Sequence, residues 1–418
     1  MKTEALFAAI IRGSIIEKVR QSWVVAWESI DSRESTDSLD VMKVPESEVL
    51  RINLQNEDEA EKFISEGLNK FNAGKIPIKI QLKYKETDYS YLCAPDFEGI
   101  NKIRRGEITE SWDINKETLN ASRAPVSGGD AVQAQTADFG ASRSLVVKNR
   151  IVLVTGGAQG FGEEITRGLV SAGALVFIAD LNIKGAENLA DKLNGEQGKT
   201  IAFAAEVNVG DEASVEKMTE RIALLAGGLD LCVSNAGVLR AAAILEQDIA
   251  SFRFVTDINY TAFAIVTKHC GLLMRAQNRC APSWTTDIIQ INSKSGLDGS
   301  NKNGAYAGSK FGSIGLVQSF AKELVDYRIK VNAVCPGNFF DGPLWADPEK
   351  GLFVQYLRTG KVPGAKTIEE VKSYYEARVP MGRGCTGPDV IRAVLYLVEQ
   401  VYETGQALPV TGGQVMLS

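Results

Sequence analysis

Short apolar segments alternate with longer amphipathic ones over the last two-thirds of the chain. Seven of the apolar segments are rich in β-branched residues, and helical patterns of about 12 to 20 residues separate most of them. The segments are 151–154, 175–178, 201–204, 229–234, 287–291, 330–334 and 407–410. Strands that are apolar throughout are typical of parallel sheets buried on both faces. The alternation therefore predicts an α/β fold, a doubly wound parallel sheet, for residues 147–418.

The first 120 residues show a different pattern, which predicts a small α+β domain. The expected elements are a helix from Thr3 to about Trp27, a strand at 49–54, a helix from Asn56 to about Phe71 and a strand at 77–84. Trp23 and Trp27 are four residues apart, so on a helix they would form a packing ridge. No motif in this domain carries chemistry. It could recruit a partner, cap the catalytic surface, or remain from a larger fused ancestor.

Residues 121–146 separate the two parts. They are rich in Ala, Ser and Gly and contain almost no large apolar side chains, so they cannot bury a core. We interpret them as a flexible linker between a domain at 1–120 and a domain at 147–418.

Composition narrows the possible functions. The chain has 418 residues and a net charge of -6, which argues against nucleic acid or an anionic membrane as the main partner. Its six cysteines are scattered without metal-ligand spacing, and its single histidine, His269, excludes a multi-histidine metal site and a Ser–His–Asp triad. The apolar run at 5–11 is interrupted by Arg12 and lacks a cleavage site, so we expect a cytoplasmic protein without a metal or a membrane span.

A glycine-rich loop follows the first strand of the predicted sheet. Strand 151–154 runs into Gly156, Gly157, Gly160 and Gly162, and a helical pattern begins there. Glycines let the backbone turn tightly and approach a pyrophosphate, which then lies at the helix N-terminus where N–H groups point at it. In this context the loop indicates a dinucleotide-binding fold of the Rossmann type.

Asp180 ends the second strand, about 20 residues beyond the loop. A carboxylate there can accept hydrogen bonds from both hydroxyls of the adenosine ribose and would repel the 2′-phosphate of NADP. No lysine or arginine lies between Gly156 and Gly162 to offset that charge. The sequence therefore predicts NAD as the cofactor.

A set of further motifs follows at characteristic spacing. It consists of Ser234-Asn235-Ala236-Gly237 after the fourth strand, then Asn259, Ser293, and Tyr306 with Lys310 four residues later. With the glycine loop, these motifs resemble the short-chain dehydrogenase/reductase family in order and spacing over about 270 residues. That resemblance implies an oxidoreductase that transfers a hydride between an alcohol or ketone and a nicotinamide.

The catalytic residues also make chemical sense by themselves. A tyrosine is a poor proton acceptor at neutral pH because its ordinary pKa is near 10 and the phenol is almost entirely protonated. A lysine four residues later on the same helical face places an ammonium beside the phenol, which favours the phenolate. The resemblance implies that Tyr306 is the acid/base, that Ser293 binds the substrate oxygen, and that Asn259 supports a water relay to Lys310.

The family resemblance also implies a full cofactor site. Its expected members are Gly156, Gln159, Gly160, Phe161, Gly162, Asp180, Asn208, Val209, Asn235, Ala236, Gly237, Tyr306, Lys310, Pro336 and Gly337. Two positions depart from the common family pattern. Asn208 stands where an aspartate often follows the third strand, and Ser234 replaces the first asparagine of Asn-Asn-Ala-Gly. Asn208 can still donate and accept hydrogen bonds, so we expect it to bind the adenine.

A narrower resemblance concerns the substrate. The segments at 288–296, 304–312, 374–385 and 410–416 are similar to the sorbitol-6-phosphate 2-dehydrogenases of that family. This implies a phosphorylated polyol or ketose as substrate, whose phosphate needs a cation, and we expect Lys294 and Arg383 to serve. The segment 338–355 is expected to form a lid.

Two alternatives stay open at this point. The chain could act on another secondary alcohol or ketone, or it could be a regulatory protein that senses NAD without turnover. The presence of Ser293, Tyr306 and Lys310 together favours an enzyme. By resemblance we also expect a homodimer or homotetramer.

Overall fold

The structure is a computed structural model that describes residues 1–28, 49–54, 75–76, 79–84, 87–105, 112–113, 146–349, 351–358, 360 and 362–416. The predicted helix at 56–71 and the predicted linker at 121–146 lie outside the described residues, apart from Val146. Within the described part, no helix is both long and apolar enough to cross a membrane.

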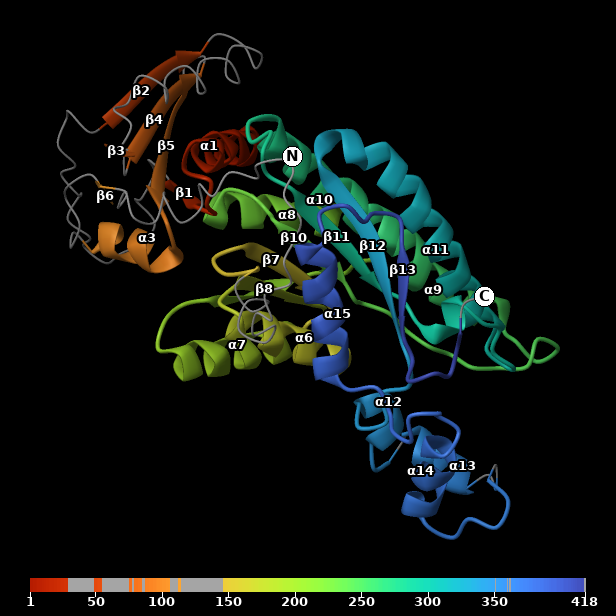
Figure 1. The fold of residues 1–418 in the computed structure, drawn as a ribbon. Coiled ribbons are helices and arrows are strands. Elements are labelled where there is room, and N and C mark those ends of the chain that lie inside the picture. Colours follow the sequence, from red (N-terminus) through yellow and green to blue (C-terminus); the bar gives the residue numbers. More distant parts are fainter. Residues whose placement is uncertain are drawn as a thin grey trace, which may run out of the picture.

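A seven-stranded parallel sheet forms the centre of the described structure (Figure 1). Its strands are β7 (Ile151–Thr155), β8 (Leu175–Asp180), β9 (Ala202–Glu206), β10 (Leu231–Ser234), β11 (Thr286–Ile291), β12 (Ile329–Pro336) and β13 (Ala407–Val410). The order across the sheet is β13-β12-β11-β10-β7-β8-β9, and all neighbours are parallel. The seven predicted strands and the predicted doubly wound fold are confirmed.

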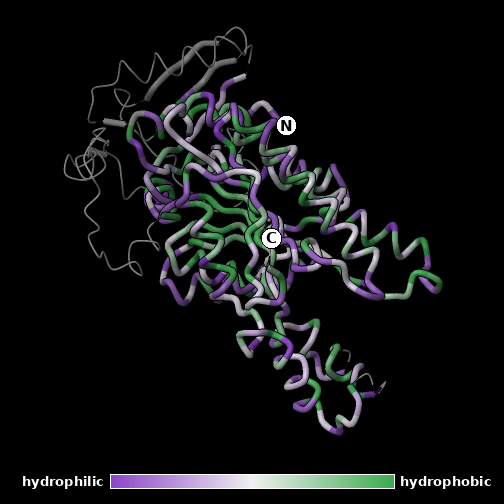
Figure 2. The backbone as a smooth tube through the Cα atoms, turned by 45° about the vertical axis from the view of Figure 1, so that its right-hand side comes forward, coloured by the Kyte–Doolittle hydropathy of each residue, from purple (hydrophilic) through white to green (hydrophobic). Residues whose placement is uncertain are grey.

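Helices cover both faces of this sheet because strand side chains alternate in direction. Leu153 and Phe177 belong to one core cluster, whereas Val154 and Ile178 belong to the other. The first cluster includes α8 (Glu212–Ala226), α10 (Ala262–Arg279) and α11 (Gly304–Leu324). The second includes α6 (Gly160–Ser171), α7 (Ile183–Gln197) and α15 (Gly387–Glu399). Figure 2 shows the hydrophobic residues concentrated in the central strands.

The N-terminal part contains a second sheet. Its order is β1-β5-β4-β2, with β1 (Val24–Glu28), β2 (Val49–Leu54), β4 (Lys79–Tyr84) and β5 (Thr87–Ala94). The predicted strands at 49–54 and 77–84 match β2 and β4. Two further elements, β5 and α3 (Phe97–Arg104), were not expected, and β3 (Lys75–Ile76) pairs with β6 (Trp112–Asp113).

The expected first helix is too long. Helix α1 covers Thr3–Val19 and ends at Arg20, whose φ of 59° is left-handed and therefore stops the helix. The β-branched run that follows forms β1, where Val24 and Val25 are buried. Trp27 consequently lies on a strand, so the predicted ridge of Trp23 and Trp27 on one helix is wrong.

Helix α1 packs against α8 and α10 on one face of the catalytic sheet (Figure 1). It is buried on all sides, and residues such as Ala5 and Ala9 join the core cluster of the parallel sheet. Phe97 of α3 contacts Phe203 of β9 edge to face, with ring centroids 4.7 Å apart. The N-terminal sheet and the parallel sheet therefore share one continuous hydrophobic core.

A small helical subdomain follows β12 and projects from the body of the molecule (Figure 1). It comprises α12 (Pro343–Ala346), α13 (Leu352–Arg358) and α14 (Ile368–Glu376). Its own core includes Phe340, Trp345, Phe353, Val371 and Val379. The expected lid at 338–355 thus forms the first half of this subdomain, which we call the lid.

Candidate active site

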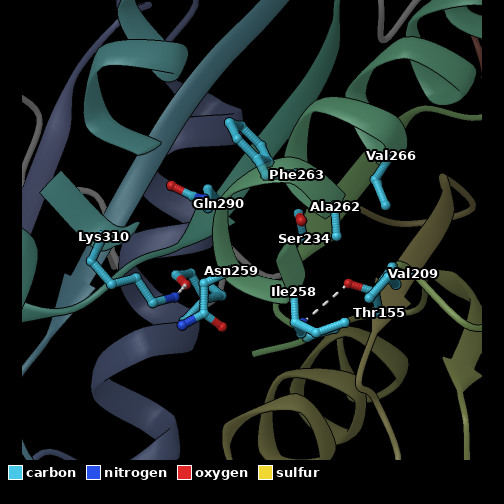
Figure 3. Close-up of a pocket in the computed structure, with 12 residues that line it drawn as sticks. Thr155, Val209, Ser234, Ile258, Asn259, Ala262, Phe263, Val266, Gln290 and Lys310 are labelled. Atoms are coloured by element: carbon cyan, nitrogen blue, oxygen red, sulfur yellow. Dashed lines mark hydrogen bonds between the residues drawn. The ribbon is translucent and has the colours of Figure 1, made fainter. Parts of the chain in front are cut away.

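The glycine loop, the Ser234–Gly237 segment and Ser293 follow the carboxyl ends of β7, β10 and β11, whereas Asp180, Asn208 and Pro336 lie at the ends of β8, β9 and β12. A small cavity there is lined by residues including Thr155, Ser234, Asn259, Gln290 and Lys310. Figure 3 shows Lys310 and Asn259 together on one side of this cavity, and Thr155 and Val209 on the other. In an open parallel α/β sheet, this edge is where ligands bind.

The glycine loop has the geometry that a diphosphate requires. Gly156 and Gly160 have φ of 61° and 58°, values that L side chains rarely adopt. At Gly162 a Cβ would lie 1.9 Å from the carbonyl oxygen of Gly156, so only glycine lets the loop fold onto the helix. Gln159, the residue before α6, makes no side-chain capping bond to the first helical turn. The amides of that turn therefore remain available to an anion.

Asn235 and Thr155 join the glycine loop to the end of β10. The Asn235 side-chain amide donates to the carbonyls of Thr155 and Gly156, at 3.1 and 3.0 Å. The Thr155 hydroxyl accepts from the backbone amides of Asn235 and Ala236. Thr155 was not among the predicted site residues, although its place between the first strand and the first glycine was a usable signal.

Asp180 occupies the position expected for ribose recognition. It ends β8 and is 9% exposed, and its carboxylate accepts from the amides of Ala158, at 3.1 Å, and Asn182, at 2.9 Å. The first of these bonds places the carboxylate directly beside the glycine loop. Asn208 lies two residues beyond β9, where its side chain accepts from the Gly210 amide at 3.1 Å.

Ser293 and Tyr306 are in contact at the end of β11. Ser293 precedes a short 3-10 turn, Lys294–Gly296, and its hydroxyl oxygen accepts from the Ser295 amide at 3.1 Å. Burial raises the pKa of the Tyr306 phenol, and a hydrogen bond from Ser293 opposes that rise. Ser293 therefore stabilises the phenolate that proton abstraction requires.

Lys310 lies on the same face of α11 as Tyr306, as the i, i+4 spacing predicts. Its ammonium is 5.7 Å from the centroid of the Tyr306 ring and donates to the carbonyl of Ile291 at 2.9 Å. Burial lowers the pKa of Lys310 to about 8, so the side chain is mostly protonated at neutral pH. A positively charged group therefore lies near the Tyr306 phenol and lines the cavity.

Asn259 lies in a single π-helical turn, Asp257–Thr261, between α9 (Ile249–Thr256) and α10. Its side chain accepts from the amide of Val238 at 2.8 Å and donates to that residue's carbonyl at 2.9 Å. A Cβ at Gly237 would lie 3.2 Å from Asn259 Oδ1 and 3.8 Å from Lys310 Nζ. Gly237 therefore keeps the space beside these two polar groups open.

Two supporting residues were not predicted. Asn292 donates from its side chain to Gln290 Oε1 at 2.9 Å and to the carbonyl of Lys310 at 3.0 Å, which ties the strand of Ser293 to the helix of Tyr306. Cys335 lies close enough to accept a hydrogen bond from the Ser293 amide, and burial raises its pKa to about 12. Cys335 is therefore a neutral thiol next to Ser293. Its position just before Pro336-Gly337, which the sequence assigned to the cofactor site, could have identified it as a neighbour of the site.

The two predicted substrate cations have different surroundings. Lys294 is half-buried next to Ser293, and burial lowers its pKa. Arg383 is exposed and makes two bonds to the Asp389 carboxylate, at 2.6 and 3.0 Å. It lines a cavity of about 460 Å³ with Cys385, Asp389 and Thr411. The Cys385 amide donates to the carbonyl of Asn338, so this cavity lies against the segment that leaves β12.

This arrangement suits hydride transfer at a carbinol carbon. A phenolate that is stabilised by a serine donor and a nearby ammonium can accept the alcohol proton. The uncapped helix N-terminus, the glycine loop and the Asp180 carboxylate beside it fit a nicotinamide dinucleotide. His269 lies away from these groups on α10, where it is 5% exposed and contacts Glu212 at 3.2 Å.

Comparisons with known proteins agree with this geometry. Residues 150–346 match the family model of the short chain dehydrogenases. Sorbitol-6-phosphate 2-dehydrogenase of Escherichia coli is 33% identical over 274 residues, covering 64% of this chain and 99% of the relative. The 3-oxoacyl-(acyl-carrier-protein) reductase of Aquifex aeolicus is 30% identical over 271 residues, covering 64% of this chain and 98% of the relative.

The same relationship is seen among solved structures. The crystal structure of sorbitol-6-phosphate 2-dehydrogenase from Erwinia amylovora is similar with a TM-score of 0.58 and 36% identity, covering 64% of this chain and 100% of that one. About two-thirds of this chain covers each of these relatives over almost its whole length, so the remaining third of the chain has no counterpart in them. The chain belongs to the short-chain dehydrogenase family and is an oxidoreductase acting on CH–OH groups.

Proposed function

We propose that this enzyme interconverts a hexitol 6-phosphate and a ketose 6-phosphate, with NAD as the hydride carrier. The observation that carries the proposal is the position of Lys294. Its side chain is half-buried, one residue after Ser293, and within the described residues it forms no salt bridge or side-chain hydrogen bond, although the charge of nearby Asp298 opposes the fall in its pKa. A partly desolvated ammonium that is not bonded to a carboxylate favours an anionic group on the substrate.

The catalytic step follows from the site's own residues. In the free enzyme the Ser293 hydroxyl is bonded to Tyr306. When substrate binds, that hydroxyl donates to the substrate oxygen instead and orients the carbinol carbon, while Tyr306 accepts the hydroxyl proton during oxidation and returns it during reduction. Lys310 stabilises the phenolate, and Asn259, whose side chain is bonded to the Val238 backbone, supports a relay of the proton through water to Lys310. When bound, the nicotinamide supplies the hydride acceptor or donor at C4.

The choice of NAD rests on Asp180. Members of the family use NAD or NADP, and the carboxylate of Asp180 lies beside Ala158 at the place where the adenosine ribose would be recognised. Two ribose hydroxyls can donate to this carboxylate, whereas a 2′-phosphate would be repelled by it. Among the predicted contacts, Asn208 and Val209 remain proposals for the adenine side.

The substrate phosphate has two proposed contacts. Lys294 adjoins the catalytic serine, and Arg383 lines the larger cavity, where Asp389 already neutralises part of its charge. Lys294 is therefore the principal phosphate contact, and Arg383 is the secondary one. We further propose that residues 147–418 form the catalytic domain, and that the enzyme is a cytoplasmic homodimer or homotetramer that does not act on nucleic acid or membranes.

The test is NADH formation at 340 nm by the purified full chain. Sorbitol 6-phosphate, mannitol 6-phosphate and unphosphorylated sorbitol are compared at matched concentrations with NAD and with NADP. The proposal expects turnover of a hexitol phosphate with NAD and little turnover of free sorbitol. Equal rates with phosphorylated and free sorbitol, or no turnover of any of the three, would overturn the substrate assignment.

A second candidate is the reduction of another ketone or the oxidation of another secondary alcohol. It is favoured by the 30% identity to the 3-oxoacyl reductase over a segment nearly as long as the one shared with the sorbitol-phosphate enzyme. Acetoacetyl-coenzyme A with NADH or NADPH separates the two, because a thioester substrate has no phosphate at the position that Lys294 would bind.

A further inference from the structure

The glycine loop touches the base of the lid through two aromatic rings. Phe161, the second residue of α6, stacks on Phe339, with ring centroids 4.4 Å apart and an interplanar angle of 15°. Phe339 lies two residues beyond Gly337, in the segment that leads from β12 to α12. The stack therefore joins the first turn of the cofactor helix to the start of the lid.

A second contact supports the first. The atom nearest to a Cβ placed at Gly160 is Pro343 Cδ, at 3.9 Å, so the first turn of α12 also lies over the glycine loop. A Cβ at Gly342 would lie 2.5 Å from Phe339 Cδ1, and the Gly342 amide donates to the Phe339 carbonyl at 3.0 Å. The Phe339 ring is consequently enclosed between Phe161 and the turn that begins the lid.

The next residue, Phe340, belongs to the lid core. It is 1% exposed, and its ring centroid is 5.0 Å from that of Trp345 and 5.7 Å from that of Phe353. Asp341 then pairs with Lys372 of α14 at 2.7 Å. Because packed cores resist deformation, a shift of the backbone at Phe339 moves α12, α13 and α14 together.

We propose that Phe339 is a positioning residue that couples cofactor binding to the placement of the lid. The cofactor diphosphate binds the amides of the first turn of α6, which includes Phe161. Fixing that turn fixes the Phe161 ring, and through Phe339 it fixes the lid. The coupling is reciprocal, so a lid held in place also strengthens cofactor binding. The proposal uses the dinucleotide site only and does not depend on the identity of the alcohol.

Hydrogen–deuterium exchange of the full chain, with and without saturating NADH, tests this coupling. In the unmodified protein, NADH is expected to slow exchange in peptides from α12, α13 and α14 by about threefold or more. In Phe339→Ala this slowing is lost, and the Kd for NADH rises by no more than the same factor, as the reciprocal coupling requires, so saturating NADH still fills the site. Phe339→Leu, which keeps an apolar side chain against Phe161, retains part of it. NADPH is used in parallel in case it is the cofactor that binds.

Leu344→Ala is the matched control, because Leu344 lies on α12 but is half exposed. It should keep the full slowing. Exchange in peptides from the central sheet reports whether each variant is folded. Lid peptides that exchange equally with and without cofactor, or a Phe339→Ala protein that keeps the slowing, would overturn the proposal. Failure of both NADH and NADPH to bind would remove the dinucleotide site, and the coupling with it, whereas failure to oxidise a hexitol phosphate would leave the coupling untouched.

Discussion

Arg12 and Asp230 form a completely buried ion pair between the first helix and the central sheet. Arg12 Nη2 lies 2.6 Å from Asp230 Oδ2 and Nη1 lies 3.0 Å from Oδ1, and both side chains are 0% exposed. The remaining three donors of Arg12 are satisfied by the Trp23 carbonyl, the Ser22 hydroxyl and the Gln277 side-chain oxygen. Asp230 also accepts from the Ile151 amide. The N-terminal part is therefore built into the catalytic fold.

Removing one partner of this pair should destabilise the whole enzyme. Arg12→Ala leaves Asp230 buried without its counter-charge, which costs about 3–5 kcal/mol of unfolding free energy. Urea denaturation followed by circular dichroism measures the loss. Arg20→Ala is the control on the same helix: Arg20 pairs with Glu17 at the surface, so its loss should cost less than about 1 kcal/mol. Equal effects of the two substitutions would contradict this account.

The same pair predicts part of the enzyme's response to acid. Burial alone would raise the pKa of Asp230, but the Arg12 guanidinium and the hydrogen bonds it donates hold that pKa below its ordinary value. A carboxyl whose pKa is lower in the folded state stabilises the fold above its ordinary pKa, and this contribution is lost as the pH falls. Arg12→Ala should therefore lose less stability than the unmodified protein as the pH falls below about 4, the ordinary pKa of an aspartate.

Local patterns predicted the catalytic sheet well because most positions of its strands are apolar and longer helical patterns separate most of these strands. They predicted the N-terminal part poorly. Residues such as Ala5 and Ile15 are buried by contacts with distant helices and strands, so α1 has no amphipathic face that marks its end. The helix ends at the left-handed backbone of Arg20, and an arginine at this position does not predict that conformation.

Tyr306→Phe should reduce kcat by about 10²- to 10⁴-fold, because it removes the group that exchanges the proton with the substrate. Cofactor binding, measured by NADH fluorescence, should change little. Tyr327→Phe removes a partly exposed hydroxyl beyond the end of α11 and should leave kcat unchanged. Substantial residual turnover in Tyr306→Phe would show that another group carries the proton.

Ser293 should affect the pH dependence of alcohol oxidation as well as its rate. Burial raises the pKa of Tyr306, and the hydrogen bond from Ser293 counteracts this effect. Without that hydrogen bond the pKa of Tyr306 rises further, so in Ser293→Ala the pH of half-maximal alcohol oxidation should move upward. The profile of kcat/KM against pH for both proteins measures the shift, and Ser295→Ala serves as the neighbouring control. A downward shift would contradict the assigned donor.

The motifs predicted which residues meet at the site, since family spacing specifies the strand ends that carry them. They did not predict the residues that hold those groups in place. Asn292 acts through the Lys310 carbonyl, a group 18 positions away in the sequence, and Phe339 acts through a ring on another element. Such contacts depend on how the strand ends and loops pack in three dimensions, and the spacing of motifs along the chain does not predict that packing.

Cofactor preference should depend on one carboxylate. Asp180→Asn removes the charge that would face a 2′-phosphate, an interaction of about 1–4 kcal/mol between groups near a protein surface. The ratio of kcat/KM for NADP to that for NAD should therefore rise by at least about fivefold. Asp191→Asn, an exposed substitution on the neighbouring helix α7, should leave the ratio unchanged. No change in Asp180→Asn would indicate that the ribose is recognised elsewhere.

Lys294 should discriminate between phosphorylated and free polyols. A hydrogen bond to a charged group contributes about 1.5–3 kcal/mol, so Lys294→Gln should lower kcat/KM for sorbitol 6-phosphate by about 10- to 100-fold. Activity on unphosphorylated sorbitol, measured at high concentration, should change by less than about threefold, because that substrate makes no contact with the ammonium. Lys322→Gln, which alters an exposed lysine on α11, should affect neither substrate. An equal loss on both polyols would mean that Lys294 supports the geometry of Ser293 and does not bind phosphate, and the phosphate contact would then have to be sought at Arg383.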